Sequence, residues 1–156
     1  MGIPTLIKTQ TASDSTSLEF VDGTDDVVFD GTYDEYMFVY TDINPATDAT
    51  FSFQVNATDD AGGDYDTSLI TSTYFTAHHY EDDSGTPTVA MSGATFILEQ
   101  EASFQFITQS QGNGADESAA CILHIFSPSS TTYVKHFYER SSSHHQANIT
   151  QDGFIA

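Results

Sequence analysis

Clusters of carboxylates and histidines are the parts of this sequence that could bind a metal ion. Asp59, Asp60, Asp64 and Asp66 lie within eight residues, with two glycines between them. Calcium takes about six to eight oxygen ligands, and such a loop could supply several of them. The spacing differs from the EF-hand pattern, so a solvated acidic loop is the preferred interpretation. A weak divalent-cation site is the alternative.

Two histidine pairs could add nitrogen ligands. His78 and His79 precede Glu81 closely. Neighbours on a strand point to opposite faces, so these two imidazoles would not easily share one metal ion. His144 and His145 follow three serines, which predicts a loop. We interpret these histidines as surface or hydrogen-bonded side chains, and the sequence predicts neither a metal site nor a cofactor.

A nucleophile within a recognisable local motif is not found in the sequence. The Gly-x-Ser-x-Gly pattern of many hydrolases does not occur. Cys121 lies in an apolar segment without a basic neighbour, which favours packing as a small hydrophobic side chain. A carboxylate pair of the glycosidase type stays open, because separation in space cannot be read from a sequence. We predict no catalytic residues and expect that the protein is not an enzyme.

The composition of the 156-residue chain restricts its partners. Three basic residues stand against 23 acidic ones, which gives a net charge of −20. This charge repels nucleic-acid phosphates and anionic lipids, so neither nucleic-acid binding nor membrane insertion is expected. The single cysteine excludes an internal disulfide. No linker, repeat or charge block divides the chain, which predicts one domain over residues 1–156.

The elements that would position these residues are predicted to be strands. Threonine, tyrosine and phenylalanine are abundant and favour pleated sheets, whereas leucine and lysine are few. Asp-Gly and Asn-Pro pairs mark turns, and residues 127–130 predict a four-residue hairpin loop. We expect an all-β fold, an antiparallel two-sheet sandwich of the jelly-roll type. The expected strands include residues 5–9, 17–21, 27–29, 36–43, 51–55, 103–106, 119–126, 131–140, 147–150 and 154–156.

Alternating phenylalanines predict strands with one buried face. Polar residues separate the apolar ones in residues 51–55 and 103–106. Residues 36–40 are instead apolar on both faces, so this strand is either internal to the fold or covered by another subunit. The side chains expected to face the core or a sheet are Phe51, Phe53, Val55, Phe104, Phe106, Ile122 and Leu123, the last two on opposite sides.

Several stretches of the chain are informative when taken in order: residues 6–13, 20–23, 26–33, 51–54, 77–81 and 127–137. They are similar to β-sandwich virion structural proteins from tailed phages of marine bacteria and cyanobacteria. The similarity covers roughly residues 5–156, and family members usually continue past the segment that matches residues 152–156. The sandwich is therefore expected either to be incomplete as given or to lack a C-terminal hairpin and leave an edge for a partner.

The resemblance implies a phage virion structural protein without catalytic residues. A capsid decoration (cement) protein on the outer shell suits the small size and the acidity. The alternative is a tail-fibre or receptor-binding component that contacts host surface glycans, and a small jelly-roll hydrolase is a remote third class. The expected partners are further copies of the chain, as a homotrimer, and the major capsid protein or tail proteins. The expected location is the virion, on the outer surface of the capsid or on the tail.

Overall fold

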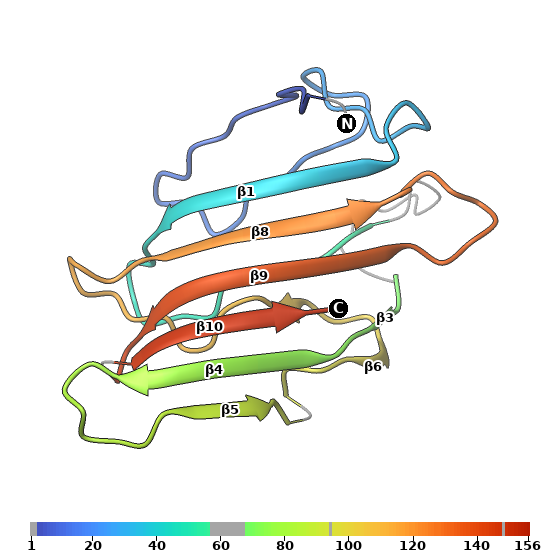
Figure 1. Cartoon of the computed structure of the whole chain (residues 1–156). Helices are drawn as coiled ribbons and strands as arrows, with labels where there is room; N and C mark the ends of the chain where they lie inside the picture. Colours follow the sequence, from blue (N-terminus) through green and yellow to red (C-terminus); the bar gives the residue numbers. More distant parts are fainter. Residues whose placement is uncertain (1–2, 57–67, 94, 148) are drawn as a thin grey trace.

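Six antiparallel strands form one large sheet, in the order β1-β8-β9-β10-β4-β5 (Figure 1). The computed structural model describes residues 3–56, 68–93, 95–147 and 149–156. Within these residues there are ten strands and no helix, so the predicted all-β, antiparallel fold is confirmed. The sandwich and the jelly-roll topology stay predictions. The strands of the large sheet are β1 (Glu35–Ile43), β4 (Tyr74–Tyr80), β5 (Thr88–Met91), β8 (Ala119–Phe126), β9 (His136–His145) and β10 (Ile149–Ile155).

Two short ladders and irregular segments cover one face of this sheet. β2 (Ser52–Phe53) pairs with β7 (Gln105–Phe106), and β3 (Ile70–Thr71) pairs with β6 (Glu99–Glu101). They lie behind the large sheet in Figure 1. We call the covered side the inner face and the opposite side the outer face.

The apolar core lies between the inner face and this covering layer. Its fully buried members come from both sides, with rings of partly buried aromatics around them. The Phe53 and Phe137 rings, for example, meet edge to face with centroids 5.2 Å apart. The buried cluster consists of Phe53, Tyr74, Ile107, Cys121, Leu123 and Ile155.

β8 shows how the sequence alternation produces the two faces. The strand was predicted over residues 119–126, and the structure confirms it. Cys121 and Leu123 point inward and are buried, whereas Ile122 points outward and is 40% exposed. The expectation that Ile122 and Leu123 face opposite sides is therefore confirmed, and Ile122 does not belong to the core.

The alternation in residues 103–106 was interpreted in the wrong register. Gln105 is completely buried, and Phe104 is 49% exposed. The Gln105 amide donates to the carbonyls of Phe96 and Phe106, and its oxygen accepts from the Ser72 hydroxyl at 2.5 Å. Because its polar atoms are satisfied, a glutamine occupies the position expected for a phenylalanine. Residues 51–55 form only the short β2: Phe53 is buried, Phe51 is half-buried and Val55 is exposed.

The N-terminal segment lies beside β1 without forming the strands expected at residues 5–9 and 17–21. Figure 1 shows this segment, in dark blue, running past β1 at the edge of the sheet. Phe20 and Phe29 pack against Phe38, with ring centroids 5.4 and 6.2 Å away. Side-chain packing rather than ladder hydrogen bonds therefore holds this segment to the sheet. Residues 27–29 contribute only an isolated bridge between Thr24 and Val27.

The last two strands begin and end at other residues than predicted. β9 runs through the serines to His145, so the loop expected at His144 and His145 is wrong. Residues 127–135 form the connection before it, longer than the expected four-residue loop. The turn expected at Gly153 is also wrong, because this glycine lies within β10. A Cβ at Gly153 would come within 2.6 Å of the Ser141 hydroxyl, so close packing accounts for the glycine.

The edges of the large sheet are β1 and β5. β10 pairs with β9 and β4, so this last strand is itself not an edge of the sheet. The two alternatives given for a missing C-terminal hairpin stay predictions. β1 is also not internal to the fold, since Met37 and Val39 on its outer face are 47% and 57% exposed. Of the two alternatives for residues 36–40, cover by another subunit is the one that stays open.

Candidate functional site

Most of the residues first considered for metal binding are now placed. Residues 59–66 lie outside the described part of the chain, so the weak cation site there stays a prediction. His78 faces the inner side and His79 the outer side of β4, since their partners are Gln151 and Thr150 of β10. In the part of the chain that is described, no group of three or more His, Cys, Asp or Glu side chains is placed to hold a metal ion.

His144 joins three segments at one end of the sheet. Its Nε2 lies 3.1 Å from Oε1 of Glu81, in the β4–β5 connection. Its Nδ1 lies 3.1 Å from Oε1 of Glu117, although this contact lacks hydrogen-bond geometry. Glu117 in turn accepts from the Gly114 amide at 2.5 Å. Through these contacts His144 links the segments that carry Glu81 and Glu117 to β9. The two carboxylates lie against different nitrogens of the imidazole, so the three side chains do not converge on one metal ion.

A shallow hollow of about 300 Å³ lies next to His144. The outward positions Ala120, Ser142 and Thr150 on three adjacent strands carry small side chains, which leaves space above the sheet. The hollow offers hydroxyl and imidazole groups that can donate or accept hydrogen bonds. Its lining residues are Ser118, Ala120, Ser142, Ser143, His144 and Thr150.

The outer face of the sheet carries a continuous apolar band. One cross-strand row contains an outward side chain from each of the six strands. Apolar groups of this size are normally found inside a protein, and a patch across a whole sheet marks an interaction surface. We call this row, which runs across the centre of the outer face, the outer row. It consists of Val39, Ile122, Arg140, Phe154, Phe75 and Met91.

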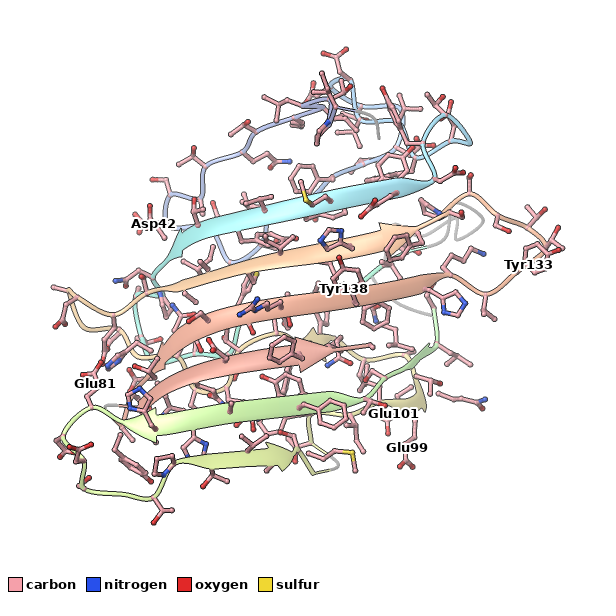
Figure 2. All side chains as sticks on the ribbon, in the orientation of Figure 1. Asp42, Glu81, Glu99, Glu101, Tyr133 and Tyr138 are labelled. Carbon is pink, nitrogen blue, oxygen red and sulfur yellow. The ribbon has the colours of Figure 1, made fainter. Side chains whose placement is uncertain are left out.

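The side chains of the outer row and its neighbours are ordered by contacts with one another. The Arg140 guanidinium lies over the Phe154 ring, 5.3 Å from its centroid. In the next row the His124 and Tyr138 rings stack at 4.3 Å, and Phe126 stacks on Tyr138 at 5.9 Å. Figure 2 shows Tyr138 on the side of β9 that faces the viewer. These contacts between side chains are present in the single chain, before any partner binds.

The outer face carries little charge. Among the outward positions that the strand pairing assigns, Glu35 and Asp152 are acidic and Arg140 is basic, so their sum is 1 − 2 = −1. The exposed Asp42 lies in the bulge at the end of β1. Glu35 at one end lies 2.5 Å from the Nδ1 of His124. Most of the acidic residues that the structure describes therefore lie off this face.

The inner face contains a carboxyl group in an unusual environment. Glu139 is 1% exposed, and its neighbours in register are Leu123 and Ile155. The Ser141 hydroxyl is near, but it donates to the Ile107 carbonyl at 3.1 Å, and neither carboxyl oxygen of Glu139 has a hydrogen-bond partner. Burial raises the pKa of Glu139 to about 8, and Ser141 lowers it by a smaller amount. The group is therefore protonated and uncharged at neutral pH.

Cys121 lies in the same inner region, as predicted for a small hydrophobic side chain. It is 4% exposed. Burial is the main cause that raises the pKa of its thiol, and the nearby Glu139 carboxyl adds to this. A protonated, inaccessible thiol is a poor nucleophile, so Cys121 has a packing role.

Comparisons with known proteins add no relative. No protein-family model matches the chain, and neither a curated protein nor a solved structure is similar to it. The described residues contain no apolar helix of membrane-spanning length. The resemblance to phage virion proteins therefore rests on the sequence stretches given above and stays a hypothesis.

The outer row and Glu139 were both missed by sequence reasoning. In β9 neither alternating set is apolar: Tyr138, Arg140 and Ser142 face outward, whereas Glu139 and Ser141 face inward. The signal that could have indicated the outer face was the doubly apolar segment at residues 36–40, which was noted. It marked only one of the six strands that contribute.

Proposed function

We propose that this protein is a structural component of a phage virion, a decoration (cement) protein on the outer surface of the capsid. It takes no part in chemistry and works by holding its place in an assembly. Its partners in this proposal are further copies of itself and the major capsid protein. The apolar outer face is the single observation that carries the proposal.

An exposed apolar band across six strands supports a role in an assembly. The band includes Val89 and Met91, which are 81% and 65% exposed on the edge strand β5. Keeping such a surface in water costs free energy at roughly 25 cal/mol per Å² of apolar area, which contact with a partner recovers. The rest of the described surface carries most of the acidic side chains, which suits a shell protein that faces water and repels its neighbours elsewhere.

The finer parts of the fold and assembly belong to the same proposal. A jelly-roll sandwich is common in virion proteins, and the large sheet with its covering layer is compatible with half of such an arrangement. A homotrimer was expected from the need to bury the apolar patch in a closed ring. The homo-oligomer is part of the proposal, and its order is to be measured.

The hollow beside His144 favours a second candidate function. Its hydroxyl and imidazole groups lie on the same face as the exposed Tyr138 ring, and glycan sites combine such groups with aromatic surfaces. In this alternative the chain is a tail-fibre or receptor-binding component that contacts host surface glycans. Binding to a glycan array that is lost on His144→Ala, but not on His79→Ala, would favour it over the capsid role.

The number of copies per particle tests the proposal. Purified particles would be analysed by quantitative mass spectrometry against the major capsid protein, and density maps of intact particles would locate the chain. Hundreds of copies on the capsid surface are expected for a decoration protein. A few dozen copies would indicate the tail, and absence from purified particles would overturn both virion roles.

A further inference from the structure

We propose that the outer face is covered by the outer face of a second copy of this chain. The two large sheets would pack face to face around a two-fold axis, and the contact would complete a β-sandwich between two chains. This pairing goes beyond the virion role and does not depend on it.

Pairing between copies requires a surface where like charges do not oppose it. Each copy carries −20, so contact through most of the surface would bring acidic side chains together. The outward positions assigned by the strand pairing sum to −1, with Arg140 near the centre of the face and Glu35 at its end. A basic partner would instead be attracted to the rest of the surface, which carries most of the described acidic side chains. The charge distribution therefore favours a copy of the chain on this face.

The size of the face is sufficient for a stable dimer. The six strands are spaced about 4.8 Å apart, and each has about seven residues with a rise of roughly 3.3 Å per residue, so one face of the sheet covers about 600 Å². Two such faces would bury at least about 1,200 Å² in total, because protruding side chains add to the flat area. Specific protein interfaces start near about 1,200 Å². The outer face reaches this size only if most of it takes part.

The shape and chemistry of the face suit sheet-on-sheet packing. Its side chains are aliphatic or aromatic along the outer row, and ring stacking already orders those of the neighbouring row. Two sheets pack about 10 Å apart with their strands inclined by about 30°, so that such side chains interdigitate. A two-fold axis lets one face serve as both halves of the contact and leaves no open-ended surface for further growth.

Matched charge variants on and off the face test the pairing. Arg140→Glu removes the guanidinium that lies over the Phe154 ring and adds an acidic group near the centre of the interface in each copy. Lys135→Glu makes the same change of charge in the β8–β9 connection. Val39→Glu and Val134→Glu form a second pair, with side chains that are 57% and 77% exposed. Figure 2 shows the adjacent Tyr133 beyond the end of the sheet, so this connection serves as the control.

Analytical ultracentrifugation of the full chain should show a dimer that dissociates at least tenfold more readily with Arg140→Glu or Val39→Glu. The two control variants should dimerise like the unmodified protein, and circular dichroism should show unchanged strand content in all four. Folded on-face variants that dimerise as tightly as their controls would overturn the proposal.

Methionine oxidation gives a second measurement that needs no variant. Met37 and Met91 both lie on the outer face and are 47% and 65% exposed in the single chain. Hydroxyl-radical labelling of both should slow several-fold from dilute to concentrated protein, while labelling of Tyr133 stays constant. Equal labelling at all concentrations, a monomer throughout, or an oligomer of another order such as a trimer would overturn two-fold pairing. None of these results would change the copy number in particles, so the virion proposal is tested separately.

Discussion

On the central strands of the large sheet, the side chains that face the core include Glu139, Ser141 and Ser143, whereas Tyr138 and Phe154 face outward. On the neighbouring strand β8, the side chains that face the core are apolar, as is usual, and Cys121 and Leu123 are buried. The inner face is thus partly polar, and the outer face is largely apolar. A sheet exposed to water on one side normally shows the opposite arrangement.

The two faces differ in how their contacts are completed. On the inner face several polar groups find partners within the chain, as where Ser141 and Tyr74 both donate to the Ile107 carbonyl at 3.1 Å. On the outer face the apolar groups have no covering layer in the described chain. The inner face therefore stabilises the single chain, and the outer face is expected to contribute free energy only in an assembly.

The comparison is tested most strongly by truncating two neighbouring residues of β8. Leu123→Ala removes a side chain that is 2% exposed and should lower the free energy of unfolding by about 2–5 kcal/mol. Ile122→Ala, on the outer face, should cost less than about 1 kcal/mol in the single chain. Urea unfolding of dilute, monomeric protein measures both. Similar losses for the two variants would mean that the outer face is covered within the chain.

Glu139→Gln tests the polar part of the inner face through pH. The pKa of Glu139 is raised from 4.5 to about 8 on folding, so its stabilising contribution is complete below about pH 4.5 and lost as the pH rises through 8. Above pH 8 the variant should be more stable than the unmodified protein, by on the order of a few kcal/mol. Thermal unfolding from pH 4 to 9 measures this.

Glu101→Gln, on the exposed strand β6, makes the same change of charge and is the control. The pH dependence of unfolding of this variant should be nearly the same as that of the unmodified protein. If the unmodified protein and Glu139→Gln lose stability with the same slope between pH 5 and 8, Glu139 is already charged in the folded chain.

Gly153→Ala tests how closely the inner face is packed. The new methyl group would lie 2.6 Å from the Ser141 hydroxyl and 2.9 Å from that of Tyr74, and it should destabilise the fold by about 1–3 kcal/mol. The methyl group added by Gly93→Ala would have no atom within 4 Å, so this variant is the control. Equal melting temperatures for the two variants would show that β10 is less tightly held than its register indicates.

Salt should have the smallest effect, acting on association through the outer face. The Debye length falls from about 30 Å at 0.01 M salt to about 3 Å at 1 M, which screens repulsion between two chains of −20. The dimer dissociation constant should decrease several-fold over this range, with divalent cations more effective than sodium. Sedimentation measurements in NaCl and then in CaCl₂ or MgCl₂ would show it. A dissociation constant that rises with salt would indicate attraction between opposite charges instead.

The sequence determined the fold class and the strands formed by apolar runs between turn signals. β8 was predicted at its observed bounds, and β1 was predicted within one residue, because short runs of apolar, β-branched and aromatic residues favour strands. Composition alone indicated an all-β chain, and the lone Cys121 in an apolar segment was correctly expected to pack in the core. These features depend on local patterns that a sequence contains directly.

Only the tertiary structure decided the last strands and the roles of the two faces. Residues 141–145 carry no strand pattern, yet they form part of β9 because β8 and β10 supply ladder partners on both sides. Gln105 and Glu139 are buried because of neighbours distant in the sequence, whereas Phe104 is not. A shift of one residue exchanges the two faces of a strand, and in strands with mixed alternation only pairing with the neighbours fixes that choice. For this reason the outer face could be recognised only after the six strands were placed side by side.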